Sequence, residues 1–281
     1  MSDVVALTDE HWESAWRLSR LAFGGDPAAP PPERPPGPPR SDGWGVLDER
    51  GRLLGKALLH DYGQWWGGRE VPMGGVAGVA VHPDARGTGT ASRLLTALLP
   101  EMTSRGQGIS VLFPTVVPLY RSLGWEVVGA LDDTRLATRD LAPDGSADCS
   151  VRTGEAERDA AAVERLYDAW AAAGSGALTR RGRLFPRGAD DAFEADLVSL
   201  AAGPDGVARG YVSYDRGRGY RGGEGELRVW ELVAADAGAA RALRGRCSPR
   251  WRAGARWPRP CSGAGRPPGC SGWSTQPSPR R

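Results

Sequence analysis

The sequence contains very little lysine and cysteine. Lys56 is its single lysine, so almost all of its 36 basic side chains are arginines. We attribute this bias to a GC-rich coding sequence, and by itself it indicates no function. The four cysteines have neither CxxC spacing nor neighbouring histidines, so no zinc site is expected.

Long hydrophobic runs are also absent. The N-terminus lacks a basic region followed by an apolar run, and no segment approaches the roughly 18 apolar residues of a membrane-spanning helix. We therefore expect a cytoplasmic protein that uses no membrane. Its 281 residues suffice for one large domain or two smaller ones.

Acidic residues are missing from the C-terminal segment, residues 244–281, which holds nine arginines. The rest of the chain then has 27 basic and 34 acidic side chains, a net charge of −7. An acidic body argues against nucleic acid as a partner and favours cationic small molecules.

The same C-terminal segment contains no Leu, Ile, Val, Phe or Met. Such a composition cannot build a core, so residues 244–281 are predicted to be disordered. It resembles GC-rich DNA read in the wrong frame; the alternative is a genuine basic tail that binds membrane or nucleic acid.

The N-terminal half alternates predicted helices and strands. Residues 26–40, with eight prolines, are predicted to form a solvated loop or a docking site for a proline-recognising module. Residues 71–81 are predicted to form a strand whose glycines at 74, 75 and 78 suggest a bulge or the close approach of a ligand. The pattern further predicts helix 8–23, hairpin 43–65, helix 91–102 kinked or shortened at Pro100, strand 109–113, helix 118–123 and a strand from Trp125.

A turn between strand 71–81 and the next helix carries the clearest chemical signal, in the stretch VAVHPDARGTGTASRLL. Backbone N–H groups of residues 86–92 would face the mouth of this turn, at the positive end of the helix dipole, where anionic oxygens bind. The turn lacks the lysine of a Walker loop, and Ser92 replaces the third glycine of a dinucleotide fingerprint.

Two ordered motifs resemble those of the GCN5-related N-acetyltransferase (GNAT) superfamily. In the first, Arg86 is followed by Gly89 and Ala91 at the spacing of that superfamily's pyrophosphate loop. In the second, Tyr120 is followed by Gly124 and an aromatic residue. The whole chain looks most like the Eis (enhanced intracellular survival) acetyltransferases, in which two GNAT units precede a further domain.

The resemblance implies an α/β GNAT fold with a mixed sheet flanked by helices, followed by a partial, degenerate second GNAT unit. Residues 1–145 would be the first unit, residues 146–243 the second, and residues 244–281 the tail. ELVAADAGAARAL repeats the strand, turn and helix order of the first unit. In the second unit the sequence predicts a helix over 155–173 and strands over 206–215 and 225–234. The last strand is expected to have an unpaired edge and an uncovered face.

The resemblance also implies a site for acetyl-CoA as cosubstrate, without a metal. The turn would bind its pyrophosphate, the preceding strand end its pantetheine and the developing oxyanion, and Tyr120 would protonate the leaving sulfur as the catalytic residue. The predicted cofactor-binding residues are Val79, Ala80, Val81, Arg86, Gly87, Thr88, Gly89, Thr90, Ala91, Ser92, Thr115 and Val116.

Each assignment has a structural alternative. The turn can be a tight connection, Tyr120 a core aromatic and Arg86 a surface arginine. His82 is interpreted as structural rather than as a base. Four hairpin residues are either ordinary or line a cationic acceptor pocket: Asp61, Trp65, Trp66 and Glu70.

The sequence thus predicts an N-acetyltransferase acting on a primary amine of an aminoglycoside, a polyamine or a lysine. In the Eis family the base is the carboxylate at the end of a C-terminal domain, and this sequence shows no such domain. The alternative is a non-catalytic acyl-CoA-binding remnant. Relatives suggest a homo-oligomer.

Overall fold

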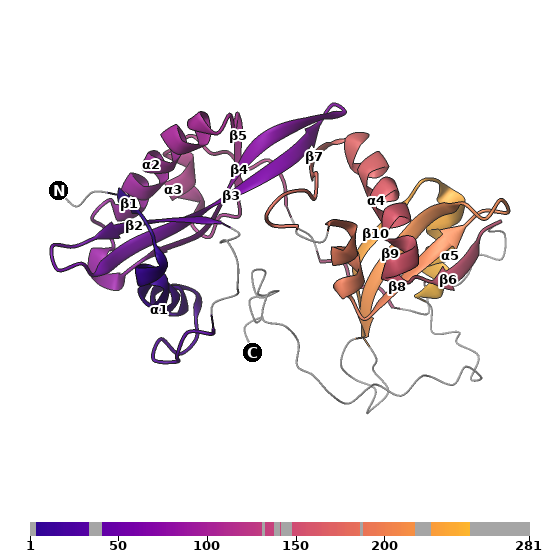
Figure 1. Cartoon of the computed structure of the whole chain (residues 1–281), viewed down its shortest axis with the longest axis horizontal. Helices are drawn as coiled ribbons and strands as arrows, with labels where there is room; N and C mark the ends of the chain where they lie inside the picture. Colours follow the sequence, from indigo (N-terminus) through magenta and orange to yellow (C-terminus); the bar gives the residue numbers. More distant parts are fainter. Residues whose placement is uncertain are drawn as a thin grey trace.

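The computed structural model describes residues 4–33, 41–130, 133–137, 141, 148–185, 188–216 and 226–247. Two sheets form its framework (Figure 1). The first has the strand order β1-β2-β3-β4-β5, with β7 beside β3, and the second has the order β10-β9-β8-β6. No helix within these ranges has the length and apolar character needed to cross a membrane.

The first half follows the predicted order closely. The β2–β3 hairpin forms because the Asp48 carboxylate accepts hydrogen bonds from the N–H groups of Arg50 and Arg52, while Gly51 supplies a φ of +75°. The elements are β1 (Val4–Ala6), α1 (Trp12–Phe23), β2 (Asp42–Leu47), β3 (Leu53–Trp66), β4 (Arg69–Val81), α2 (Thr90–Ser104), β5 (Ile109–Leu112) and α3 (Val117–Arg121), with short 3-10 helices η1 (Asp9–His11) and η2 (Pro83–Ala85).

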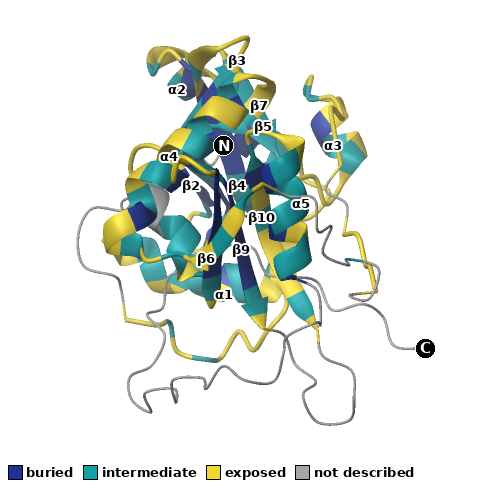
Figure 2. Ribbon diagram, turned by 90° about the vertical axis from the view of Figure 1, so that its right-hand side faces the viewer, coloured by how far each residue is buried: buried dark blue, intermediate teal, exposed yellow. Residues whose placement is uncertain are grey.

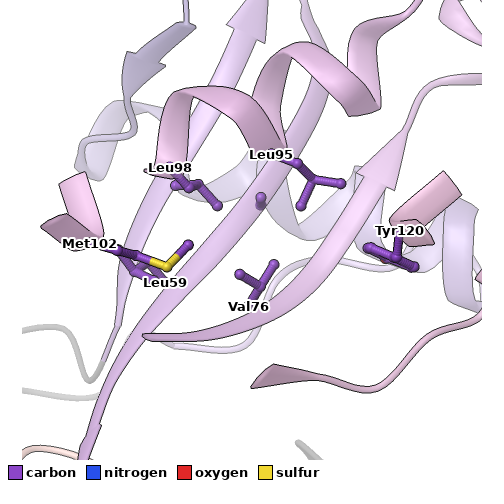
Figure 3. Packing of buried hydrophobic residues seen from close by; sticks show 7 residues of the cluster. Leu59, Val76, Leu95, Leu98, Met102 and Tyr120 are labelled. Atoms are coloured by element: carbon purple, nitrogen blue, oxygen red, sulfur yellow. The ribbon is translucent and has the colours of Figure 1, made fainter. Parts of the chain in front are cut away.

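Helices cover both faces of the first sheet. On one face, Leu95 and Leu98 of α2 pack against Leu59 of β3 and Val76 of β4 (Figure 3). On the other face, Leu18 of α1 packs with residues of β3 and β4. Figure 2 shows the resulting contrast between buried strands and helices with exposed outer faces.

Helix α2 does not end at Pro100, so the expected shortening is wrong. Pro100 is exposed, and the helix continues to Ser104. Met102 is 3% exposed in the core, and its carbonyl accepts the N–H of Gln107. This burial anchors the last turn and offsets the hydrogen bond that proline removes.

The β3–β4 hairpin extends beyond its own sheet. At its tip, Trp65 packs into the core of the second half, and Gln64 donates a hydrogen bond of 2.6 Å to the Gly176 carbonyl. β7 pairs with this end of β3. A segment of the second half therefore completes the first sheet.

The second half is built around its own sheet. Helix α4 covers one face of it and helix α5 the other. Sequence patterns did not identify β6, β7 and β8, which are short. The elements are β6 (Ser150–Thr153), α4 (Ala156–Ala172), β7 (Ser175–Leu178), the 3-10 helix η4 (Gly188–Glu194), β8 (Leu197–Ala202), β9 (Ala208–Arg216), β10 (Leu227–Ala234) and α5 (Ala237–Arg246).

The expectations about the end of the chain hold in part. The face of β10 is covered only in part, where Val233 is buried beneath α4 and Leu243 of α5 packs on the opposite face of the sheet. Val229, Trp230 and Leu232 remain 45%, 54% and 39% exposed, as expected. The edge is as expected: within the described residues β10 pairs only with β9. The predicted tail begins too early, since α5 runs to Arg246 and Cys247 is buried. Residues 248–281 lie outside the described ranges, as do residues 34–40 of the proline-rich loop.

The internal repeat is confirmed by the order of elements. β1, α1, β2, β3, β4 and α2 correspond to β6, α4, β8, β9, β10 and α5, and the four strands lie in the same spatial order in each sheet. β10 also carries a bulge, between Val229 and Glu231.

The strand predicted from Trp125 is absent. Residues 125–130 are irregular, and Val127 and Val128 are 60% and 92% exposed. In the described part of the chain β5 pairs only with β4, so no further strand supplies the ladder hydrogen bonds that a strand needs. Trp125 instead packs edge-on against Tyr120, with ring centroids 6.4 Å apart.

Two adjacent leucines of α2 test this packing. Leu98 is fully buried and Leu99 is 41% exposed. We expect Leu98→Ala to lower the free energy of unfolding by about 2–5 kcal/mol, because it leaves a cavity under α2. Leu99→Ala should change it by less than about 1 kcal/mol. Urea denaturation followed by circular dichroism measures both, and equal losses would contradict the described core.

Candidate active site

Strands β4 and β5 separate halfway along β4. Their parallel pairing runs from Met73 opposite Ile109 to Val76 opposite Leu112, where β5 ends. β4 continues to Val81. Within the described residues this second half of β4 has no strand partner on its β5 side, so its backbone is free to bind a ligand there.

A bulge interrupts β4 at this opening. Leu58 of β3 lies opposite Ala77, but Lys56 lies opposite Ala80, so Gly78 and Val79 together oppose a single residue of β3. Gly78 has a φ of +55°, which explains the glycine. The bulge expected from the sequence is confirmed, and it re-aims the backbone just before Val79, Ala80 and Val81.

The predicted turn follows β4 through η2 and enters α2. Gly87 and Gly89 have φ angles of +77° and +78°, and a Cβ on either would meet no atom within 4 Å. Gly89 is the N-cap of α2, which has neither a side-chain cap nor an acidic residue in its first turn. The helix therefore presents uncapped N–H groups to open space, as an anion site requires.

Side chains within the turn hold its shape. Thr88 donates a hydrogen bond of 2.8 Å to the Ala85 carbonyl, and its hydroxyl lies 2.9 Å from that of buried Thr90. His82 accepts the N–H of Asp84 at its Nδ1, a contact that favours its structural interpretation. Of the remaining predicted residues, Arg86 is exposed, whereas Ala91 and Ser92 are half-buried in the first turn of α2.

Tyr120 lies on the β5 side of the opening. It is 7% exposed and belongs to the α2 core cluster (Figure 3). Val79 also packs against this cluster. Burial raises its pKa, so it stays protonated at neutral pH. Thr115 and Val116 are exposed in the link between β5 and α3.

The hairpin acids face the second half of the chain. Asp61 accepts hydrogen bonds from Arg105 at 3.0 Å and Gln107 at 2.7 Å, and also from Arg183. Burial opposes the ionisation of Asp61, but these guanidinium groups outweigh it and lower its pKa. Glu70 accepts from Thr179 at 3.0 Å. These carboxylates are already paired, so they support the ordinary interpretation over a cationic pocket.

Lys56 is a candidate residue that the sequence patterns missed, since base composition accounted for the rarity of lysine. The side chain is 4% exposed and lies on the face of β3 opposite to Ala57 and the α2 core. Burial alone lowers its pKa to about 8, and no ion pair or hydrogen bond in the described part of the chain offsets that cost. What identifies Lys56 as a candidate is the burial of a cation beside the bulge, and amino-acid composition carries no information about burial.

The corresponding turn of the second half is closed to anions. Helix α5 is capped by Asp236, whose carboxylate accepts the Ala239 N–H at 2.8 Å. A carboxylate at this helix N-terminus satisfies the N–H groups that α2 leaves open. Of the two repeats, only the first presents an uncapped helix to a phosphate.

Comparison with known proteins concerns the fold rather than the individual site residues. Residues 3–128 match the family model described as an acetyltransferase (GNAT) domain. The fold is that of the GNAT acetyltransferases. A GCN5-related N-acetyltransferase from Kribbella flavida is 28% identical, with a TM-score of 0.67 over 88% of this chain and 60% of its own.

Two further structures share the fold at lower identity. A GCN5-related N-acetyltransferase from Anabaena variabilis has 21% identity and a TM-score of 0.69, and Eis1 from Mycobacterium abscessus has 22% and 0.60. Each match covers 88% of this chain but only 62% of the other protein. No curated protein matches the sequence.

The cost of burying Lys56 is measurable. Its pKa is about 8 in the folded chain, against 10.5 for a lysine side chain in water, so folding is penalised by roughly 3 kcal/mol below pH 8. We expect Lys56→Met to stabilise the chain at pH 7, and the gain to shrink as the pH rises from 8 to 10.5, where the lysine becomes neutral in the folded and the unfolded chain alike.

Urea denaturation at pH 7 and pH 10 measures this difference. Arg50→Met removes an exposed cation and serves as the control. A gain that does not depend on pH would show that Lys56 is not buried as a cation.

Proposed function

We propose that the chain is an Eis-like N-acetyltransferase that transfers the acetyl group of acetyl-CoA to a primary amine. The observation that carries this proposal is the uncapped N-terminus of α2 at the end of the unpaired half of β4. Residues 1–145 would form the catalytic unit and the residues from 146 to the end of α5 the degenerate one, so that a tail would begin only after Cys247.

The pyrophosphate of acetyl-CoA would bind at the turn. The N–H groups of residues 86–92 and the dipole of α2 supply the attraction, and Gly87 and Gly89 leave room for close approach. Arg86 adds a positive charge at the exposed rim.

The backbone of β4 would hold the acyl arm. Val79, Ala80 and Val81 would bind the pantetheine amides, and an N–H near the bulge would bind the developing oxyanion. In other enzymes such a donor lowers the activation free energy by about 3 kcal/mol. Thr115 and Val116 would line the same path from the link between β5 and α3.

Tyr120 would act as the general acid. Its raised pKa keeps the phenol protonated. Its membership of the core cluster against which Val79 packs supports a position near the proposed thioester. A phenol with a pKa near or above 10 is a weaker acid than a thiol, whose pKa is about 8.5. Net protonation of sulfur therefore requires the proton released by the attacking amine to restore Tyr120.

A non-catalytic acyl-CoA-binding protein is the second candidate. The chain spans about 60% of the length of the Kribbella flavida and Mycobacterium abscessus structures that it matches. The resemblance to the Eis family implies a base from a C-terminal domain, and the described residues supply no group assigned to that role. The proposed acceptors are amines of aminoglycosides, polyamines or lysine side chains. We propose that the protein acts in the cytoplasm, binds neither nucleic acid nor membrane and uses no metal. A homo-oligomer is proposed on the strength of relatives alone.

Thiol release from acetyl-CoA with a panel of such amines separates the two candidates. Amine-dependent release of free thiol supports transfer. Saturable acetyl-CoA binding by calorimetry, without release for any amine, would favour the binding protein.

Replacing Tyr120 tests its role as acid. We expect Tyr120→Phe to lower kcat by roughly 10²–10⁴ while acetyl-CoA affinity stays within about threefold. Tyr214→Phe removes a buried hydroxyl of the second half and should leave both unchanged. An unaltered kcat in Tyr120→Phe removes Tyr120 from the mechanism.

Replacing Gly89 tests the pyrophosphate site. We expect Gly89→Val to weaken acetyl-CoA binding by about tenfold or more, because its side chain fills the space over the helix N-terminus. Gly51→Val is the matched control, since Gly51 has a φ of +75°, equal open space and a place in a distant hairpin turn. If both variants bind acetyl-CoA equally, the turn is a connection only.

A further inference from the structure

Lys56 lies on β3 between β2 and β4, beside the bulge of β4. Gly45 of β2 and Ala80 of β4 are its neighbours across the ladders. The residue is on the α1 side of the sheet, since Ala57 next to it faces α2. The side chain is buried, with 4% of its surface exposed, yet its amine has no counter-ion among the described residues.

The amine of Lys56 reaches the bulge itself. Its Nζ lies 3.4 Å from the position that a Cβ on Gly78 would occupy. Gly78 adjoins Val79, the first of the residues proposed to hold the acyl arm. The absence of a side chain at Gly78 therefore leaves the amine next to the backbone that would position the thioester.

The choice of lysine has a chemical consequence at this place. An arginine stays charged at any physiological pH and is not a nucleophile. A lysine whose pKa is lowered to about 8 by burial is partly neutral near pH 7 to 8. Lys56 is thus partly present as a neutral, nucleophilic amine, whereas the arginines of the chain remain charged.

We propose that Lys56 is an internal acetyl acceptor, acetylated by the acetyl-CoA bound in the cleft of the same chain. This inference rests on the proposed function, because it needs the thioester to lie at the bulge. It adds to that function a modification site inside the first unit.

The step balances without a further reactant. The neutral Nζ of Lys56 attacks the carbonyl carbon of the thioester, a C–N bond forms and the C–S bond breaks. The proton lost from the amine reaches the sulfur by way of Tyr120. The products are N-acetyl-Lys56 and coenzyme A.

Acetylation would also remove the charge from a buried position. An amide is neutral and needs no counter-ion, so it fits a site without an acidic partner better than an ammonium does. The product is therefore expected to persist and to fill the α1 side of the opening, where an external amine would otherwise approach.

The single lysine makes the experiment unambiguous, because any N-acetyl-lysine in the wild-type chain lies at position 56. The full chain is incubated with isotope-labelled acetyl-CoA, digested and analysed by mass spectrometry. The variant Arg50→Lys adds one exposed lysine to the same molecule as an internal reference. Its unfolded form in urea gives the intrinsic reactivity of both amines.

We expect Lys56 to react at least about tenfold faster than the introduced lysine in the folded chain, because a held amine has a high effective concentration. In urea the two rates should agree within about twofold. The rate at Lys56 should not change on dilution of the protein, since the step occurs within one chain. A rate that falls with dilution, or faster reaction of the exposed lysine in the folded chain, would overturn the inference.

Calorimetry on the same samples separates this inference from the proposed function. Acetyl-CoA binding without modification of Lys56 overturns the inference alone. Absence of acetyl-CoA binding overturns the proposed function and the inference with it.

Discussion

The antiparallel pairing of β3 with β4 is the constraint on which the rest of the structure depends. Its register runs from Gly55 opposite Val81 to Trp66 opposite Arg69, with one bulge. One end of this ladder shapes the opening beside β5, and the other end carries Trp65 into the second core. A single hairpin therefore both forms the candidate site and joins the two halves.

The two repeats differ mainly in how their helices begin. Gly89 leaves the N-terminus of α2 open, whereas Asp236 fills that of α5 with its own carboxylate. The bulge of the second sheet lies next to Glu231, which accepts from Arg180 at 2.6 Å and from Tyr211. Corresponding strands of the two repeats thus both carry a bulge, which adjoins the candidate site in one repeat and a polar network in the other.

Local patterns predicted what depends on local forces. The apolar spacing of α2, the glycines of the turn and the bulge at Gly78 could be predicted because each follows from the periodicity or φ requirement of a few residues. The strand expected from Trp125 could not be corrected from sequence, because an apolar run indicates a strand whether or not a neighbour is there to pair with it. For the same reason β7 could not be predicted from local sequence, since the strand with which it pairs lies more than 100 residues earlier.

The candidate site divides in the same way. Its phosphate-binding turn is a contiguous segment, so the sequence was enough to propose it. The pairing of Asp61 with Arg105 and Arg183, and the isolation of Lys56, result from residues distant in sequence. Composition assigned Lys56 to base usage, because the cost of its burial exists only once β2, β3 and β4 surround it.

The position of β7 has a consequence for the order of events during synthesis. Residues 175–178 hydrogen-bond to the far end of β3, so the first sheet lacks a strand until the ribosome has made α4 and the residues after it. Until then the tip of the β3–β4 hairpin, including Trp65, is exposed in the nascent chain. The first half therefore completes its fold only after the second half has been translated.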